Sequence, residues 1–182
     1  MNGYEVLLFL HVASVIVWLG TGSSLAVLAL YGQRQGDRAL LERLGPFGRW
    51  LGPRVFGPAA IGALVFGLAL VADGHWTFRP LWIKLGLAAY AGSFLLNVGV
   101  RVPLMRRLHR PAGERRRDVR LLARLPVLEL TVLYLAVADM LGKPSGADSG
   151  TLAAGAVILA LASAPLVAGA LTTPRAQEAP AR

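Results

Sequence analysis

Residues 4–31 have the sequence YEVLLFLHVASVIVWLGTGSSLAVLALY, which is apolar over more than the length of a membrane-spanning helix. Crossing the roughly 30 Å hydrocarbon core of a bilayer takes about 20 helical residues. Four further apolar stretches reach that length, namely residues 52–72, 81–100, 122–141 and 151–171. We therefore predict an all-α fold, a polytopic bundle of five transmembrane helices that forms a single domain over residues 1–173. Residues 174–182 are predicted to be a disordered cytoplasmic tail.

The basic residues are divided unequally between the two ends of this predicted bundle. Sixteen of the 19 Lys and Arg residues lie on one side of these stretches: between the first and second or the third and fourth, after the fifth, or in the first three residues of the second and fourth stretches. The other three are Arg79, Lys84 and Lys143. Because basic residues concentrate on the cytoplasmic side of membrane proteins, the N-terminus should be outside and the C-terminus inside. We expect a multi-pass protein of a bacterial cytoplasmic membrane.

Composition narrows the classes of function. The chain has no Cys, which excludes disulfides, thiolate metal sites and cysteine redox chemistry. A net charge of +9 would suggest nucleic acid in a soluble chain, but here the charge flanks membrane helices, where each cation attracts anionic lipid by about 1 kcal/mol. We therefore expect the lipid bilayer as the partner, with anionic lipids at the Arg-rich inner loops, and no nucleic acid. The sequence also leaves open whether the chain forms a homo-oligomer or binds another membrane protein.

Two segments carry more detailed expectations. Residues 37–44 alternate leucines with charged residues, which predicts amphipathic helical turns on the inner membrane surface. Gly45 and Pro46 should then break the chain before the second membrane helix. In the fifth stretch, alanines recur every four residues at positions 156, 160, 164 and 168, a pattern that lets a neighbouring helix approach closely.

Six polar side chains interrupt the apolar helices, and they are the candidates for a functional site: Glu5, His11, Lys84, Asn97, Glu129 and Asp139. A charged side chain at the centre of a membrane helix costs about 2.5 to 3.5 kcal/mol on insertion scales, so each one needs a partner or a function. All but Asn97 and Glu129 should lie in the outer half of the bundle. We expect the two carboxylates of the fourth helix, Glu129 and Asp139, to pair inside the bundle with Lys84 or Arg54.

His11 shares a helix face with Trp18 and Gly22, so it should point into the bundle. Three interpretations stay open: a neutral imidazole hydrogen-bonded across a helix interface, a haem or metal ligand, or a proton-transfer group. Lys84 is one of two lysines in a chain rich in arginine. It either extends its amine to water or provides a titratable amine at a site.

Three short motifs resemble a bacterial superfamily of small helical membrane proteins. The pattern His11-x6-Trp18-x-Gly20 is similar to the start of the HemJ-type protoporphyrinogen oxidases, of the membrane domain of copper resistance protein D, and of the family called domain of unknown function 2269. Trp82-Ile83-Lys84-Leu85 resembles the Lys-containing helix of those families, and MLGKP at residues 140–144 resembles the end of the fourth helix in the uncharacterised family. The resemblance covers roughly residues 1–145 and is greatest to the uncharacterised family.

In the haem-using branch, the resemblance implies that His11 is an axial ligand and Lys84 its functional partner. The HemJ-type proteins follow their first helix with a basic and aromatic stretch ending in His, where this chain has LALYG at residues 28–32. This difference counts against the oxidase activity.

We therefore predict an integral membrane protein of undetermined biochemical role, with a polar pocket around His11 in the outer half. The alternatives are a haem-linked or porphyrin-linked membrane redox protein, and a small permease or accessory subunit of a membrane complex. We favour a protein without enzymatic activity. If the protein is an enzyme, we expect a haem-dependent oxidoreductase with His11 and Lys84 as the candidate catalytic residues. Its haem b would lie among His11, Trp18, Lys84 and Met140, with His11 on the iron.

Overall fold

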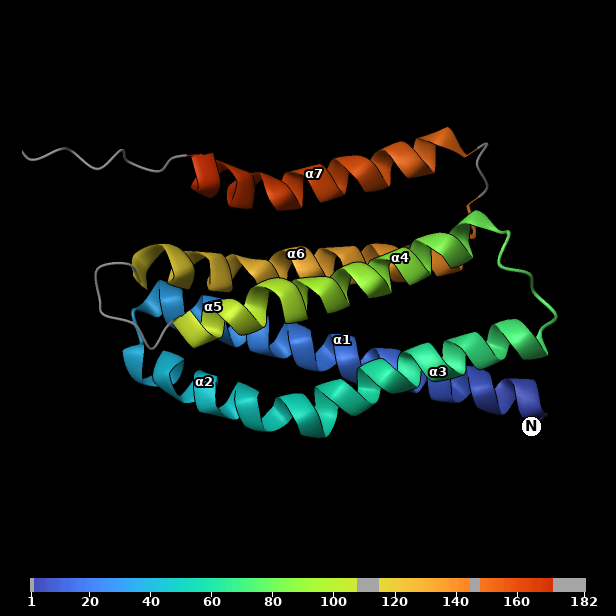
Figure 1. The fold of residues 1–182 in the computed structure, drawn as a ribbon, viewed down its shortest axis with the longest axis horizontal. Helices are drawn as coiled ribbons and strands as arrows, with labels where there is room; N and C mark the ends of the chain where they lie inside the picture. The colour runs from blue at the N-terminus through green and yellow to red at the C-terminus, as the bar shows by residue number, and fades with distance from the viewer. Residues whose placement is uncertain (1, 108–114, 145–147, 172–182) are drawn as a thin grey trace, which may run out of the picture.

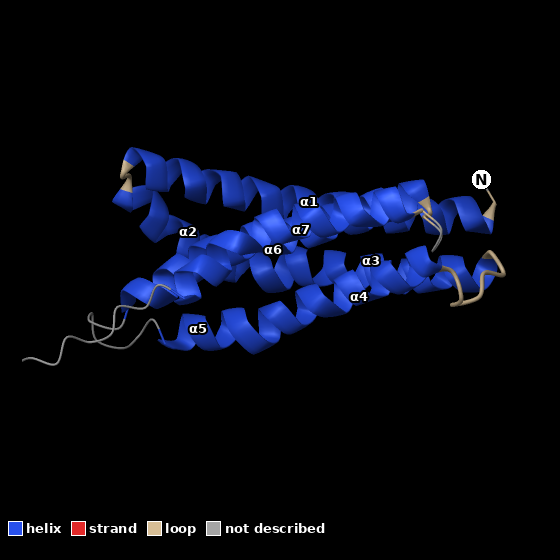
Figure 2. Cartoon of the chain, turned by 90° about the horizontal axis from the view of Figure 1, so that it is seen from above, coloured by secondary structure: helices blue, strands red, loops and turns tan. Residues whose placement is uncertain are grey.

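The computed structural model describes residues 2–107, 115–144 and 148–171, and the predicted tail at 174–182 lies outside them. Nearly all of the described residues are helical and none forms a strand, which confirms the all-α prediction (Figures 1 and 2). The helices, with two π-helical segments labelled η, are α1 Gly3–Gln35, α2 Arg38–Leu51, η1 Gly52–Phe56, α3 Gly57–Asp73, α4 Leu81–Leu95, η2 Leu96–Arg101, α5 Val102–Arg107, α6 Arg115–Gly142 and α7 Ser149–Leu171.

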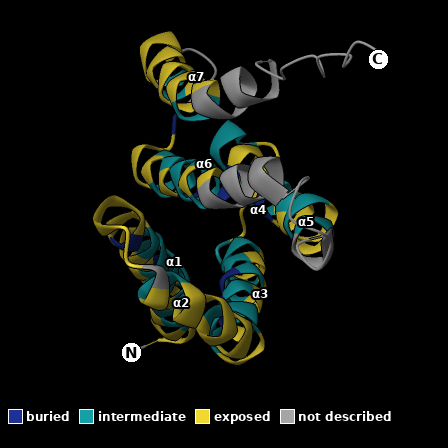
Figure 3. Cartoon of the chain, turned by 90° about the vertical axis from the view of Figure 1, so that its left-hand side faces the viewer, coloured by how far each residue is buried: buried dark blue, intermediate teal, exposed yellow. Residues whose placement is uncertain are grey.

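The long helices lie side by side and form a bundle. Helix α1 packs against α3 and α6, α4 packs against α6, and α7 covers the outside of α6 (Figures 1 and 3). The turn between α1 and α2, helix α5 and the start of α6 lie at one end, which we call the arginine-rich end. The N-terminus, residues 74–80, the end of α6 and the start of α7 lie at the opposite end.

The described part of the bundle buries few apolar side chains and exposes many large ones, which is unlike a water-soluble protein. Six apolar residues are buried among those described: Leu19, Ala59, Ala63, Ile83, Leu125 and Leu133. Large apolar side chains are exposed along every long helix, for example Phe9, Ile61, Phe94, Leu141 and Leu161. By length and composition, four helical spans are able to cross a membrane, over Gly3–Gln35, Ala39–Asp73, Leu81–Leu104 and Arg124–Gly142. The apolar α7 adds a fifth membrane helix to the candidates.

The expected break before the second membrane helix is wrong. Gly45 and Pro46 lie within α2, and the helix continues through η1 into α3 as one rod over Ala39–Asp73. Within η1 the chain switches to wider turns, with the Gly57 N–H bonded to the Gly52 carbonyl. Prolines lack the N–H that a regular helix needs, and local π-type turns can compensate for this; Pro53 lies within η1, and Pro58 is the second residue of α3. The leucines of α2 pack on Gly32 of α1, so these turns cover the end of α1.

The most extensive contact between helices is that of α1 with α3, and small residues permit it. Ala59 and Ala63 are buried at a spacing of four residues, and Gly67 continues the same row. A Cβ atom added to Gly62 would lie 2.6 Å from the Ser14 hydroxyl oxygen. This is the packing typical of membrane helices with small residues at the interface. Of the alanine pattern expected on the last helix, Ala156, Ala160 and Ala164 are exposed on α7, so they do not bring another helix of this chain close; the side chain of Ala168 lies outside those that the structure describes.

Candidate functional sites in the membrane helices

Three side chains from α4, η2 and α6 form a polar cluster toward the arginine-rich end, which we call the Glu129 clamp. The Ser93 hydroxyl donates to Glu129 Oε1 over 2.8 Å, and Arg101 Nη1 lies 3.2 Å from Glu129 Oε2. Ser93 is 3% exposed, and the side chains of Glu129 and Arg101 are 13% and 24% exposed. Both oxygens of this part-buried carboxylate therefore have partners, as a charge in a low-dielectric region requires.

The π-helical segment η2 places Arg101 in this cluster. Ser93 and Arg101 are eight residues apart, so in a regular α-helix, at about 100° per residue, they would differ by roughly 80° around the axis. The wider turn of η2, with the Val102 N–H bonded to the Asn97 carbonyl, rotates less per residue and removes much of that offset. A π-helical turn inside an α-helix is frequent at functional sites.

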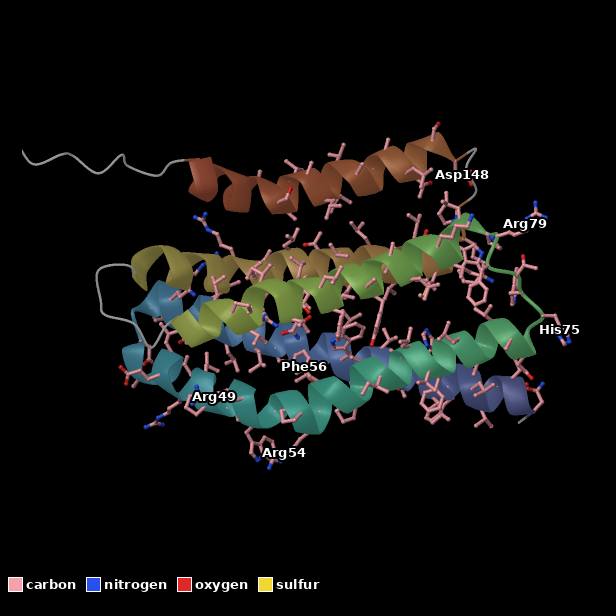
Figure 4. The ribbon with its side chains drawn as sticks, in the orientation of Figure 1. Arg49, Arg54, Phe56, His75, Arg79 and Asp148 are labelled. Carbon is pink, nitrogen blue, oxygen red and sulfur yellow. The ribbon has the colours of Figure 1, made fainter. Side chains whose placement is uncertain are left out.

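Glu129 is therefore paired, but not with the partner that we predicted. The guanidinium of Arg54 instead lies 5.1 Å above the Trp50 ring and donates to the Trp50 carbonyl over 3.2 Å. Arg54 points away from the bundle beside α2, as does Arg49, whereas Phe56 lies between η1 and α1 (Figure 4). In the sequence, Arg101 directly follows the apolar stretch 81–100, and Ser93 lies inside it. Ser93 and Arg101 are polar residues at an apolar helix, but the spacing alone does not place them on one face, because that depends on the π-helical turn of η2.

His11 makes a hydrogen bond across the interface of α1 and α3. Its Nδ1 lies 2.8 Å from the carbonyl oxygen of Ala63. Because a carbonyl oxygen can only accept, Nδ1 must carry the proton of this bond. The ring also lies against Gly67, where an added Cβ would be 3.0 Å from His11 Cε1. The small residues of α3 thus hold the imidazole in one orientation, and Nε2 is left with its lone pair when the ring is neutral.

The other residues of the predicted haem pocket lie in different contacts. Trp18 forms an edge-to-face contact with Tyr90 of α4, with ring centroids 5.6 Å apart. The Met140 methyl group packs against Gly86, so it lies between α6 and α4. Lys84 is exposed, and it lies about 120° around α4 from Tyr90 and 160° from Gly86, as helical geometry requires. Of this set, Trp18 extends from α1 across to α4, while Lys84 lies away from both neighbouring helices.

Asp139 has the opposite environment to Glu129. Both carboxylate oxygens are buried, and neither has a hydrogen-bond partner among the residues that the structure describes. The predicted pairing with Lys84 is not present, since the Lys84 side chain is exposed. Lys143, one turn further along the chain, donates its backbone N–H to the Asp139 carbonyl over 2.7 Å. Its amine contacts two tryptophan rings instead of the carboxylate.

The rings of Trp76 and Trp82 lie together at the end of the bundle opposite the arginine-rich end. Lys143 Nζ lies 5.4 Å from the centroid of Trp76 and 5.7 Å from that of Trp82, and the two indoles meet edge to face. Trp76 belongs to the turn between α3 and α4, and Lys143 follows α6, so these cation–π contacts join both connections. Lys143 has a positive φ of 45°, the left-handed conformation common just after a helix end.

The last two predicted polar residues have local backbone roles. Glu5 forms a capping box with Asn2, in which the Asn2 side chain accepts from the Glu5 N–H and the Glu5 carboxylate accepts from the Asn2 N–H. Asn97 is exposed within η2. Within the described part of the chain, no three His, Asp or Glu residues lie close enough together to hold a metal ion.

Comparison with known proteins gives one result. A family model described as "Predicted integral membrane protein (DUF2269)" matches residues 5–141, three quarters of the chain. The matched range contains the Glu129 clamp, His11 and Asp139, and leaves α7 outside. No curated protein and no solved structure shows a significant match.

Proposed function

The chain belongs to this family of integral membrane proteins, and from that premise we propose that it binds haem b or a related porphyrin through His11. We place it in a bacterial cytoplasmic membrane and relate it to the superfamily of the HemJ-type oxidases and the copper resistance protein D membrane domain. The support for that relation is the sequence pattern His11-x6-Trp18-x-Gly20 in the first helix. The proposal is one of binding, without the oxidase reaction.

The hydrogen bond from His11 to Ala63 carries this proposal. Histidines that bind a metal usually donate their other ring N–H to a carbonyl or carboxylate, which fixes the tautomer and the ring orientation. The Nδ1 bond of 2.8 Å is of this kind, so Nε2 is the nitrogen that would bind iron. A single histidine is sufficient, because globins and peroxidases hold haem iron by one proximal His. Met140 and Lys84 stay predictions as further contacts, with Lys84 the weaker because it is exposed.

An absorption spectrum tests the proposal. Protein purified from haem-supplied cells should show a Soret band, and His11→Gln should remove it. A glutamine amide can still donate to the Ala63 carbonyl, so this variant tests iron binding with less disturbance of the helix packing than His11→Ala. His75→Ala is the matched control, because His75 lies exposed on the turn between α3 and α4 (Figure 4). A folded, haem-supplied wild-type protein without a Soret band would refute the proposal.

The unpartnered carboxylate of Asp139 favours a second candidate, a small proton-linked or cation-linked permease. Ionisable groups in membrane helices commonly mark ion paths, and this one has no structural partner among the described residues. In proteoliposomes containing a pH-sensitive dye, the wild-type protein should conduct protons under an imposed potential, and Asp139→Asn should abolish the flux. Asp73→Asn, an exposed carboxylate at the end of α3, is the control. Equal flux in empty vesicles would exclude this candidate.

The proposed orientation has the arginine-rich end in the cytoplasm, and it rests on the distribution of basic residues. The chain has no Cys, so single introduced cysteines report topology directly. In intact cells a membrane-impermeant thiol reagent should label His75→Cys but not Gln35→Cys, since these exposed residues lie at opposite ends of the bundle. The reverse labelling would invert the orientation.

A further inference from the structure

Two tryptophan side chains form an aromatic cage at the end of the bundle opposite the arginine-rich end. Trp76 comes from the turn between α3 and α4, and Trp82 from the first turn of α4. Their ring centroids lie 5.6 Å apart and the rings meet at 81°, so they form two adjoining walls, which we call the tryptophan cage. The Lys143 ammonium lies 5.4 Å from one centroid and 5.7 Å from the other. The cage therefore holds a cation against two aromatic rings.

The surrounding backbone fixes both walls of the cage. The indole of Trp76 packs on Gly74, where an added Cβ would lie 2.6 Å from Trp76 Cδ1. Trp82 is half-buried, and one turn further along α4 Gly86 packs against Met140 of α6. The two rings are thus held in place by the protein itself. A site that is preorganised in this way loses less conformational entropy when a ligand binds.

Lys143 is a replaceable occupant of the cage. Its side chain is exposed, and among the described residues its ammonium contacts the two rings without forming an ion pair. Cation–π contacts at exposed sites are weak, and a primary ammonium regains strong hydration when it moves into water. A ligand cation can therefore displace the Lys143 ammonium at small cost.

The buried carboxylate of Asp139 lies one helical turn from the cage. The Lys143 N–H donates to the Asp139 carbonyl over 2.7 Å, and the two residues are about 6 Å apart along the axis of α6. Around that axis they differ by about 40°, with Lys143 between Asp139 and Met140, so Asp139 borders the face that packs on α4. Neither of its oxygens has a hydrogen-bond partner among the described residues. At neighbouring levels, α6 thus carries an ammonium without a carboxylate and a carboxylate without a cation.

These features fit an organic ammonium better than a metal ion or an uncharged ligand. Aromatic cages recognise quaternary ammonium groups such as that of choline. Calcium takes six to eight oxygen ligands, and the described part of the chain has no cluster of three acidic or His residues. An uncharged ligand would leave the Asp139 carboxylate without a counter-ion.

We propose that the tryptophan cage and Asp139 bind a small quaternary ammonium cation. Lys143 leaves the cage, the methyl groups of the ligand pack on the two indoles, and the carboxylate balances the charge. As the substrate class of the permease, this ligand rests on the second candidate function above. As a binding site it needs no transport, and it is independent of haem binding at His11.

Calorimetric titration of the purified protein with choline, in a maltoside detergent, tests the site. The wild-type protein should bind choline saturably, and dimethylbutanol, the uncharged analogue of the same shape, roughly tenfold more weakly. Trp82→Leu and Asp139→Asn should each weaken choline binding about tenfold, and Trp82→Phe, which keeps a ring, about threefold. Lys143→Gln vacates the cage and should strengthen choline binding about threefold. The control is Arg79→Gln, which removes an exposed cation from the same end and should leave the affinity unchanged (Figure 4).

The gain expected for Lys143→Gln separates a ligand site from a structural contact. If the cage serves only to join the two connections, this variant lowers the melting temperature without strengthening choline binding, which would overturn the proposal. An equal gain for Arg79→Gln would also overturn it, because the effect would then come from general surface charge. Equal binding of choline and dimethylbutanol would show a site that recognises shape and not charge, with the same consequence.

The flux assay in proteoliposomes distinguishes failure of this site from failure of the permease. Choline binding that requires Trp82 and Asp139, in a protein without any flux that depends on Asp139, supports the site and refutes the permease. Flux that depends on Asp139, in a protein that does not bind choline, refutes the site and leaves the permease in place.

Discussion

Glu129 and Asp139 lie on the same helix, α6, about 15 Å apart along its axis, but the hydrogen bonding of their carboxylates differs. Glu129 receives a hydroxyl from α4 and a guanidinium from η2, so both of its oxygens have partners. Asp139 is buried with neither oxygen bonded among the described residues. A polar group inside a membrane protein can join helices, in which case its hydrogen bonds are made within the protein. It can also be without such bonds and be able to bind a ligand or an ion.

From this comparison we expect Glu129 to stabilise the bundle and Asp139 to act in the ion path that we propose. The Glu129 clamp connects α4, η2 and α6, and its loss should loosen that contact. Nothing in the described structure makes Asp139 useful for packing, since an unpaired buried polar group costs free energy. Mutations at the two sites should therefore separate stability from activity, and three substitutions test this in order of decreasing effect.

Arg101→Met should cause the largest loss of stability. Removing one partner of a fully buried ion pair leaves an uncompensated charge and typically costs about 3 to 5 kcal/mol; because Arg101 and Glu129 are 24% and 13% exposed, we expect a loss of about 3 kcal/mol. Adding Glu129→Gln should restore part of that loss, because the remaining group is then neutral. Reversible unfolding in mixed detergent micelles measures both variants, and Arg54→Met, on the outward-facing arginine, is the control. Equal losses for Arg101→Met and Arg54→Met would show that the clamp does not stabilise the bundle.

The helices themselves were largely predictable from the sequence, because hydrocarbon thickness fixes the length of an apolar span. The continuous helix from α2 through η1 to α3 was not predictable in this way. Glycine and proline usually end a helix in water, but in this bundle a π-turn and the packing of leucines on Gly32 let the helix continue. That compensation depends on tertiary contacts between α1 and α2, which local sequence rules do not include.

Ser93→Ala should have an intermediate effect. It removes one of the two partners of Glu129 but leaves the arginine, and a hydrogen bond to a charged group is worth about 1.5 to 3 kcal/mol. The same unfolding assay applies, with Ser24→Ala as the control, because that hydroxyl bonds only to its own helix, at the Gly20 carbonyl. A loss no larger than that of Ser24→Ala would mean that Arg101 alone satisfies the carboxylate.

The candidate sites were predicted only in part. Glu129, Asp139 and His11 stood out because they are polar residues in apolar stretches, and His11 does bond across a helix interface. Their partners were not predictable, because η2 changes the face on which Arg101 lies and a carbonyl partner such as that of Ala63 leaves no trace in the sequence. Lys84 was expected to pair with a carboxylate, but its position around α4 leaves it exposed.

Asp139→Asn should have the smallest effect on stability, within about 0.5 kcal/mol or slightly stabilising, since it replaces an unpartnered carboxylate by a neutral group of the same shape. Lys84→Met should also change stability little, and the double variant should equal the sum of the two, because the groups are not paired. Melting temperatures in detergent measure all three. A destabilisation by Asp139→Asn as large as that by Ser93→Ala would mean that Asp139 has a structural partner in the membrane, and a non-additive double variant would identify Lys84 as that partner. If both results are absent and only the ion flux of Asp139→Asn is lost, the two carboxylates of α6 divide stability and function between them.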